Sequence, residues 1–582
     1  MEKHSILKNK YYLYLTEFFS GVSVMAVELG ASRLLAPYFS SSQIVWTIII
    51  GTIMIAMALG NIWGGRAADK NPDPDRLYRR LLIAAVWIAA IPLVGKYVIL
   101  GISGVLVLTV SNNFLIIAAF LACMVVFVYP LFLLGTVTPS LVKYTVESLA
   151  DSGKTVGTLG AFNTIGSIIG TFLPTFVTIP AVGTAVTFLI FSGILLLLSL
   201  IYFISKRTKP VACVVSLVLF VLCSIFGHAG SFAFWESNLV YEGESIYNYL
   251  QVKDTDRSVI LSTNVLFGVQ SILMKDDSLT GMYYDYAMLA PALAGIGKGG
   301  MDNLGKMVDE ANDSRSDMEK MTDEKSEADA RILVLGMGTG TFAKQCMRYF
   351  DGIFVEGVEI DEKITRLARQ YFDLPDSVKV TTYDGRAYLA VVDEKYDVIM
   401  VDAYQDITIP FQMSSLEFFT MVKEHLTDNG VMVVNMNMHS REKGNINDYL
   451  SDTIAAVFPH VYTADVSGST NRELFAGLNP DMLTVAKERI VGLTEGGTIT
   501  GSDELTEENQ KSQEASRELA DMLGRVLNSL KPYEKGAYLL TDDKAPVELL
   551  GMRVIDRLIE DEIGYYKDIF REDGLKGLLN AM

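Results

Sequence analysis

Acidic side chains end three stretches of the chain that have the composition of buried strands. Glu359, Asp384 and Asp402 each lie at the end of one such stretch. A carboxylate in such a place can bind ribose hydroxyls or accept a proton from an amine. Because ligands of open α/β sheets bind beyond the carboxyl ends of the strands, we expect the three acids to share one site.

A glycine-rich turn precedes the first of these acids. Gly336, Gly338 and Gly340 lie between an apolar stretch and a helical one. Glycines there let the backbone approach a ligand closely, and the following helix N-terminus favours negative charge. Glu359 comes 23 residues after Gly336, near the spacing of about 20 that is typical of a ribose-binding acid. The set indicates a site for a nucleotide or nucleoside cofactor.

The elements that must position these residues alternate between strand and helix. Strands are expected at 331–335, 353–360, 378–382, 396–401 and 431–435, and helices at 341–350, 362–372, 386–392 and 415–428. This alternation predicts a Rossmann-type α/β domain over 330–582, with a parallel sheet covered on both faces. A small antiparallel β-subdomain is expected at 240–292. The acidic, polar segment 296–329 between the two is expected to be a disordered insertion.

The chain up to residue 228 has a different composition. It carries 8 acidic and 15 basic residues, a net charge of +7, whereas the remainder has a net charge of −26. Runs long enough to cross a bilayer lie at 12–35, 43–64, 81–108, 113–137, 156–180, 184–205 and 210–228. The sequence therefore predicts a multi-pass bundle of about seven helices in a lipid bilayer over 1–228. The acidic soluble part would repel nucleic acid, which is not expected as a partner, and would attract a polycation.

Small and charged residues also stand out inside the apolar runs. Gly60 with Gly64 and Gly166 with Gly170 have the GxxxG spacing of close helix packing. Glu28 and Arg33 are costly at membrane depth, and they are candidates for an ion pair or for a function. The histidines and cysteines have no ligand spacing, so no metal site is expected.

Several motifs resemble the spermidine synthase family of polyamine aminopropyltransferases, and in particular its membrane-fused bacterial branch. They are Glu244-Ser-Ile-Tyr-Asn-Tyr249, Val358-Glu-Ile-Asp361, Tyr383-Asp-Gly385, Tyr396-Asp-Val-Ile-Met-Val-Asp402, Thr541-Asp-Asp-Lys-Ala-Pro-Val-Glu548, Glu28-Leu-Gly-Ala-Ser-Arg33 and Asn163-Thr-Ile-Gly-Ser-Ile-Ile-Gly170. The resemblance implies a small β-domain before a methyltransferase-like Rossmann domain. It also implies transfer of an aminopropyl group from decarboxylated S-adenosylmethionine, a co-substrate, to putrescine or a related small amine.

The same resemblance implies roles for individual residues. Glu359 would bind the ribose, and Asp384 with Gly385 would lie on the adenine side. Asp402 would be the base near the attacking amine, and Asp406 would be the second acid of the loop that follows it. Asn248 stands where the family has a glutamine that contacts the donor.

The sequence departs from the family pattern in three places. Thr339 replaces the aspartate that holds the donor's ammonium group, so a charge-assisted hydrogen bond is missing. One extra residue separates Asp402 from Asp406. The family's Tyr-His-Glu near the amine has no clear match around Tyr283 to Tyr286. Two other functions therefore stay open: an S-adenosylmethionine-dependent methyltransferase, and a polyamine transporter or sensor whose Rossmann domain only binds ligand.

Two arguments about the side of the membrane on which the soluble part lies give opposite answers. Basic clusters precede the first apolar run and follow the second, fourth and sixth, so the positive-inside rule with seven spans puts the soluble part outside. Adenosyl donors are made in the cytosol, which favours a cytoplasmic domain on a cell-membrane protein. A segment 210–228 that does not cross would reconcile the two arguments. A homo-oligomer is compatible with the sequence.

Overall fold

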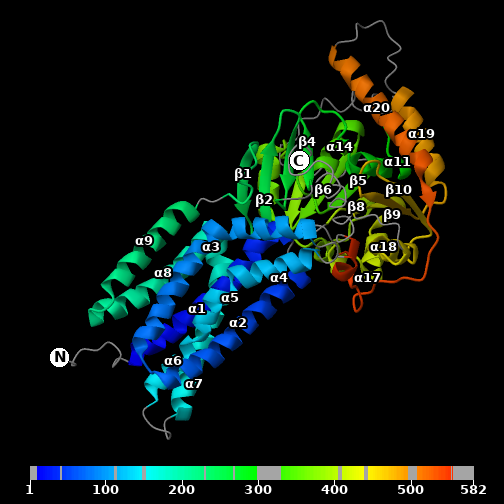
Figure 1. Ribbon diagram of the computed structural model, residues 1–582. Coiled ribbons are helices and arrows are strands. Elements are labelled where there is room, and N and C mark those ends of the chain that lie inside the picture. The colour runs from blue at the N-terminus through cyan, green and yellow to red at the C-terminus, as the bar shows by residue number, and fades with distance from the viewer. Residues whose placement is uncertain are drawn as a thin grey trace, which may run out of the picture.

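The chain has a helical part followed by two β-sheets with their helices (Figure 1). The computed structural model describes residues 10–39, 42–109, 114–146, 152–228, 231–265, 269–297, 330–403, 409–437, 443–495, 507–551 and 553–554. Nearly all of the expected insertion at 296–329 lies outside the described residues, and the domain boundaries expected from the sequence stay predictions.

The helical part is a bundle of long apolar helices. They are α1 (Lys10–Phe39), α2 (Gln43–Lys70), α3 (Pro74–Thr109), α4 (Phe114–Val126), α5 (Val128–Gly135), α6 (Val137–Thr145), α7 (Ser152–Leu173), α8 (Ile179–Lys206) and α9 (Pro210–Gly227). Among the described residues, five helical segments are long and apolar enough to cross a bilayer, or six if the bent pair Phe114–Val126 and Val128–Thr145 forms one span. That they lie in a membrane stays a prediction.

The longest of these segments, Ser152–Lys206, has 55 residues, whereas one crossing needs about 20. A π-helical turn, Pro174–Thr178, interrupts it, and Gly183 has φ 80° and ψ 169°, which is not helical. Glycine adopts this backbone conformation without the strain that a Cβ would cause. Because α7 packs on α1 and α8 packs on α3, the segment is two helices that meet at Gly183.

Both GxxxG pairs lie at helix contacts, as their spacing predicts. A Cβ on Gly60 would lie 2.3 Å from the Phe132 carbonyl oxygen of α5, and one on Gly166 would lie 2.1 Å from that of Phe18 on α1. No side chain fits at such distances, so these glycines serve the close approach of helix backbones.

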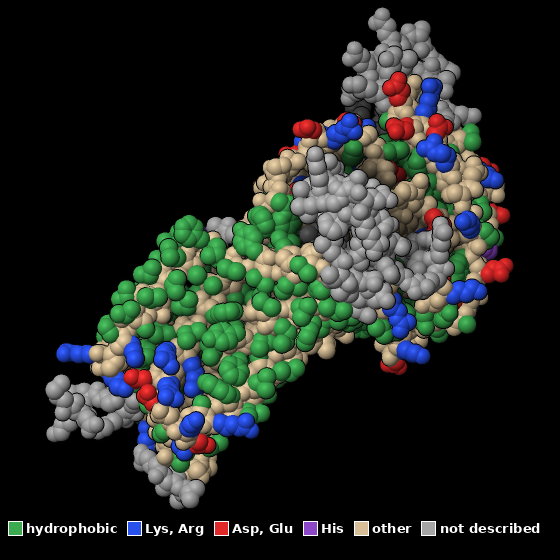
Figure 2. Space-filling view, in the orientation of Figure 1, with side chains coloured by type: hydrophobic (Ala, Val, Ile, Leu, Met, Phe, Trp, Pro, Cys, Tyr) green, Lys and Arg blue, Asp and Glu red, His purple; other side chains and the backbone are tan. Residues whose placement is uncertain are grey.

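The two ends of the bundle differ in charge. Basic side chains gather at the end away from the sheets (Figure 2), where Lys206 Nζ lies 2.5 Å from Asp75 Oδ1. At the other end the bundle contacts the later part of the chain. There the Val265 N–H donates to the Pro37 carbonyl at 2.9 Å, and Lys96 Nζ donates to that of Ser231 at 2.8 Å.

Helix α9 runs from one end of the bundle to the other. It begins at Pro210, shortly after Lys206, and its last residue, Gly227, packs against Leu93 of α3. Its 18 residues span about 27 Å at 1.5 Å per residue, close to the bilayer's hydrocarbon thickness of about 30 Å. The structure therefore gives no support to a non-crossing segment at 210–228.

A four-stranded antiparallel sheet begins the second part. Its strands, in the order β1-β2-β3-β4, are β1 (Leu239–Glu244), β2 (Tyr249–Asp254), β3 (Ser258–Ser262) and β4 (Ser271–Met274). Two short helices follow it, α10 (Tyr283–Ala287) and α11 (Leu289–Leu293).

The second sheet has eight strands in the order β12-β10-β11-β9-β8-β5-β6-β7. They are β5 (Ala330–Leu335), β6 (Ile353–Glu359), β7 (Lys379–Thr382), β8 (Tyr396–Val401), β9 (Leu426–Met436), β10 (His460–Asp465), β11 (Arg472–Gly477) and β12 (Lys531–Pro532). The helices are α14 (Thr341–Tyr349), α15 (Glu362–Tyr371), α16 (Gly385–Leu389), α17 (Leu416–Glu424), α18 (Ile446–Ala455), α19 (Met482–Glu495) and α20 (Glu507–Ser529).

The five strands expected from the sequence are present, and β5 to β9 are parallel as predicted. The expectation of a wholly parallel sheet is wrong at one edge, where β11 pairs antiparallel with both β9 and β10. The reason is that only residues 466–471 join β10 to β11, and such a short connection permits a hairpin but no parallel crossover. The strand order reverses at β5, between β6 and β8, which is where ligands of such sheets bind.

Candidate active site

The glycine turn after β5 has the backbone conformation that its residue types favour. Gly336, Gly338 and Gly340 have φ of 86°, 54° and 82°. A Cβ on Gly336 would lie 2.5 Å from the Asp402 carbonyl oxygen, so this glycine lets the ends of β5 and β8 come together. Gly340 is the N-cap of α14. The turn therefore opens the edge of the sheet between β5 and β8.

Glu359 is held at the end of β6 by backbone donors. Its Oε2 accepts the Gly338 N–H at 2.9 Å, and its Oε1 accepts the Asp361 N–H at 3.0 Å. Burial raises the pKa of Glu359 to about 7 and outweighs these hydrogen bonds, which lower it. The carboxyl group is thus fixed beside the glycine turn.

Asn248 reaches the same region from the first sheet. Its Nδ2 donates to Asp361 Oδ2 at 3.2 Å, and Ser245 Oγ donates to the same oxygen at 2.5 Å. Asp361 is in turn the N-cap of α15 and accepts the Lys363 N–H at 3.0 Å. The loop between β1 and β2 is therefore tied to the end of β6.

Asp402 is half-buried just after β8, and both of its carboxylate oxygens accept hydrogen bonds. Tyr283 Oη donates to Oδ2 at 2.7 Å, and Asn435 Nδ2 donates to Oδ1 at 2.9 Å. Burial raises the pKa of Asp402 to about 7, although both hydrogen bonds lower it. Such a carboxyl group changes its protonation state near neutral pH, as an efficient general base should.

One cavity brings seven of the nine residues predicted from the sequence together. Its lining includes Gly336, Gly338, Glu359, Asp384, Gly385, Asn248 and Asp402. Gly340 does not line this cavity, and Asp406 lies outside the described residues. Asp384 also caps α16, where its Oδ1 accepts the Ala387 N–H at 2.8 Å.

Three residues that contact or neighbour Asp402 were missed by sequence reasoning: Asn435, whose amide donates to it, Tyr283 and Glu473. Tyr283 lies in the segment where no match to the family's Tyr-His-Glu was visible, yet its hydroxyl binds Asp402. Glu473 lies on β11, fully buried, and its charge interacts with that of Asp402. In the sequence Glu473 is a lone acid two residues before Phe475, on the same face of β11, and that pattern alone does not relate it to Asp402.

Thr339 is held in the glycine turn through its backbone. Its N–H donates to Ser271 Oγ at 3.1 Å, and its buried Oγ1 has no partner among the described residues. The described residues also contain no group of three or more His, Cys, Asp or Glu that could hold a metal ion.

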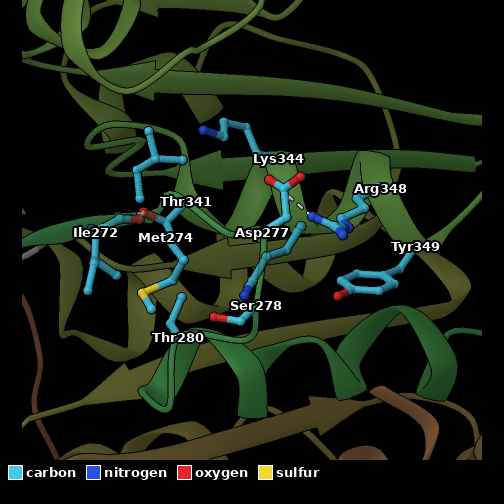
Figure 3. Close-up of a pocket in the computed structure, with 11 residues that line it drawn as sticks. Ile272, Met274, Asp277, Ser278, Thr280, Thr341, Lys344, Arg348 and Tyr349 are labelled. Atoms are coloured by element: carbon cyan, nitrogen blue, oxygen red, sulfur yellow. Dashed lines mark hydrogen bonds and ion pairs between the residues drawn. The ribbon is translucent and has the colours of Figure 1, made fainter. Parts of the chain in front are cut away.

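A second cavity lies between β4 and α14 and shares no lining residue with the first (Figure 3). Arg348 Nη1 pairs with Asp277 Oδ1 across it at 3.1 Å (Figure 3). None of the residues predicted from the sequence lines it, so it is separate from the candidate site.

Comparison with known proteins finds aminopropyltransferases and, over shorter stretches, methyltransferases: the chain is 30% identical over 171 residues to the human eEF1A lysine and N-terminal methyltransferase, covering 27% of this chain and 24% of that protein. Residues 315–467 match the family model described as a spermine/spermidine synthase domain. The chain is 51% identical over 390 residues to a "probable polyamine aminopropyl transferase" of Bifidobacterium longum, covering 66% of this chain and 78% of that protein. It is 25% identical over 270 residues to a polyamine aminopropyltransferase of Vibrio vulnificus, covering 45% of this chain and 78% of that protein. The crystal structure of a probable spermidine synthase from Corynebacterium glutamicum aligns with a TM-score of 0.33 and 19% identity, over 43% of this chain and 87% of that chain.

The sheet order and the glycine turn define a methyltransferase-like Rossmann domain. The chain belongs to the spermine/spermidine synthase family of polyamine aminopropyltransferases. Its additional helices up to residue 228 are those of a fused branch of that family.

Proposed function

We propose that the protein is a membrane-bound aminopropyltransferase. It transfers an aminopropyl group from decarboxylated S-adenosylmethionine to putrescine or a related small amine. The observation that carries the proposal is Asp402: a half-buried carboxyl group whose pKa is raised to about 7, in the same cavity as the glycine turn and two further acids.

The donor occupies the part of the cavity next to the glycine turn. Glu359 accepts hydrogen bonds from the ribose hydroxyls, and Asp384 with Gly385 faces the adenine. Gly336 and Gly338 leave room for the nucleoside against the backbone, and Asn248 closes the site from the first sheet. This assignment is supported by their common cavity and by the place of each acid at the end of a strand.

The reaction is a direct displacement at the carbon beside the sulfonium. The amine lone pair forms the new N–C bond, the C–S bond breaks, and its electron pair neutralises the sulfur. The leaving group is methylthioadenosine. An alkylammonium has a pKa of about 10.4 and is protonated at pH 7, so a proton must leave the nitrogen. Asp402 accepts it, and the protein otherwise contributes by positioning the two reactants.

The apolar helices anchor this enzyme in the membrane. Their support is the length and composition of five or six helical segments and the many large apolar side chains that they leave exposed, such as Leu197, Ile204 and Val211. A surface of this kind is stable in lipid and costly in water.

Incubation of the purified full-length protein with putrescine and each donor in turn tests the proposal. Decarboxylated S-adenosylmethionine should give methylthioadenosine and a longer polyamine. Formation of adenosylhomocysteine from S-adenosylmethionine, without methylthioadenosine from the other donor, would contradict it.

That contrary result would favour a methyltransferase, the second candidate function. One observation supports it: Thr339 occupies the position of the family's ammonium-binding aspartate, and its buried hydroxyl has no partner among the described residues. A neutral hydroxyl suits a donor that retains its methionine carboxylate better than an aspartate would.

A further inference from the structure

Glu473 is a buried acid that forms no ion pair with the described residues. The side chain has no solvent exposure. Neither Oε1 nor Oε2 has a hydrogen-bond partner in the part of the chain that the structure describes. Burying a carboxyl group without a hydrogen bond or an opposite charge is expensive, so native proteins rarely keep one without a use.

The position of Glu473 relates it to Asp402. Glu473 on β11 lies directly opposite Asn435 on β9 in the antiparallel register. Residues opposite one another in such a pair project from the same face of the sheet, about 5 Å apart at Cβ. Asn435 donates to Asp402 on that face. Glu473 is therefore next to the group that binds the proposed base.

The surroundings of the two acids are polar or aromatic rather than cationic. Tyr283 and Tyr284 of α10 have ring centroids 4.0 Å apart, and the charge of Glu473 acts on Tyr284 as well as on Asp402. Burial and the neighbouring Asp402 charge both raise the pKa of Glu473 well above its usual value. No Lys or Arg among the described residues has an ion pair or hydrogen bond with either carboxyl group.

We propose that Glu473 binds the ammonium group of the acceptor amine, which it holds beside Asp402 as a second carboxylate. The inference rests on the proposed function for the identity of the site and deepens it, because it names a further residue that binds the acceptor. Glu473 completes the binding of the cation, and Asp402 alone takes the proton. The cost of the unpartnered acid in the empty protein is recovered when the ammonium enters.

The test compares Glu473→Gln with the wild type by thermal unfolding of the full-length protein in detergent. The probe is 1,4-diaminobutane with methylthioadenosine present, and 1,4-butanediol is the uncharged control ligand. Diamine should raise the melting temperature of the wild type, and butanediol should not. In Glu473→Gln the shift should vanish, while the melting temperature without amine should equal or exceed that of the wild type, since a costly buried acid is gone.

Kinetics give an independent readout. Losing one charge-assisted hydrogen bond should raise the KM for amine by about tenfold to a hundredfold, with a smaller effect on kcat and none on methylthioadenosine affinity. Glu488→Gln, an exposed acid on α19, is the matched control and should behave as the wild type.

The outcomes separate this inference from the proposed function. A diamine shift retained by Glu473→Gln, or a lower melting temperature of that variant without amine, overturns the role of Glu473 even if methylthioadenosine is produced. A shift lost in the variant supports it even if no aminopropyl transfer occurs. A wild type that no amine stabilises overturns it.

Discussion

Asp402 accepts hydrogen bonds from a tyrosine hydroxyl and an asparagine amide. The effect of a substitution at Asp402 on folding therefore depends on how many of these hydrogen bonds the new side chain can still accept. Both donate to a carboxylate, and an asparagine can replace only one of the two acceptors. We expect Asp402→Asn to fold and to bind methylthioadenosine as the wild type does. General-base losses are typically 10²–10⁴-fold, so turnover with amine should fall by about that factor.

The pH profile supplies the sharper form of this prediction. A general base works only when ionised, and burial raises the pKa of Asp402 to about 7. The kcat/KM for amine should therefore rise as the pH increases through about 7 and then level off, and Asp402→Asn should lose this rise.

Glu359→Gln is the contrasting variant, because it should weaken methylthioadenosine binding first. Wild-type turnover in Asp402→Asn would remove Asp402 from the mechanism.

For individual residues, the sequence predicts a place in the site when the residue lies at the end of a recognisable strand. Glu359, Asp384 and Asp402 were predictable because each lies at or just after the end of a strand, and the structure brings them to one cavity. Tyr283 and Glu473 were not, since their contacts with the site come from α10 and from an antiparallel strand. Neither element has the strand–turn–helix pattern that marks the others, and their approach to Asp402 depends on tertiary packing.

The loop between β1 and β2 is the element through which the helical bundle reaches the donor site. Arg33 of α1 donates from Nη1 to the Ser245 carbonyl at 3.2 Å and from Nη2 to that of Ile246. Glu244 accepts the Thr184 N–H and hydroxyl, both at 2.8 Å, directly after the break at Gly183. Since Ser245 and Asn248 of this loop hold Asp361, the bundle fixes one wall of the candidate site.

We expect Arg33→Ala to weaken methylthioadenosine binding by about fivefold to tenfold, roughly the net worth of one ordinary hydrogen bond, because Arg33 acts on the donor site only through the loop. Turnover at saturating donor should change less, because Asp402 is not touched. Calorimetric titration with methylthioadenosine measures the first quantity. Arg33→Lys should restore part of the affinity, since an ammonium can still reach one carbonyl.

The matched control for this prediction is Arg80→Ala. Arg80 lies over the Trp63 ring, 4.7 Å from its centroid, and belongs to the start of α3 at the other end of the bundle. Its loss should leave donor affinity unchanged. Equal losses in the two variants would mean that the bundle acts through general stability and not through the loop.

Most elements were predictable from periodicity, and the exceptions have physical causes. The expected parallel strands are present in the structure because continuous apolar runs that alternate with helices have no other common arrangement. The break at Gly183 lies between the expected runs 156–180 and 184–205, as predicted, whereas its backbone conformation could not be read from the sequence. The seven apolar runs correspond to helical elements, but a run alone does not show that α4, α5 and α6 form a bent unit.

At the scale of the whole molecule, charge divides the bundle into two ends. Among the described residues up to 228, the basic side chains at the far end are Lys10, Arg66, Lys70, Arg76, Arg79, Arg80, Lys143, Lys154, Lys206, Arg207 and Lys209, whereas Arg33 and Lys96 lie toward the sheets. In a bundle that spans the membrane, the positive-inside rule predicts that the far end faces the cytoplasm.

This distribution conflicts with the cytoplasmic domain that donor chemistry alone favours, and α9 does not resolve the conflict because it runs the full length of the bundle. Basic residues near helix ends determine the orientation of a bundle during insertion, whereas the origin of a donor exerts no such force. We therefore expect the sheets, with the candidate site, on the outer face of the cell membrane.

Intact spheroplasts of a host expressing the protein test this orientation. Added protease should digest the sheets and leave the bundle, because the bilayer shields the far end. Decarboxylated S-adenosylmethionine is a cation that crosses bilayers poorly, so adding it outside should yield methylthioadenosine without permeabilisation. The control is the same preparation opened with detergent, in which production should not increase. Digestion and production that both require detergent would place the site in the cytoplasm and would show that donor supply outweighs the charge distribution.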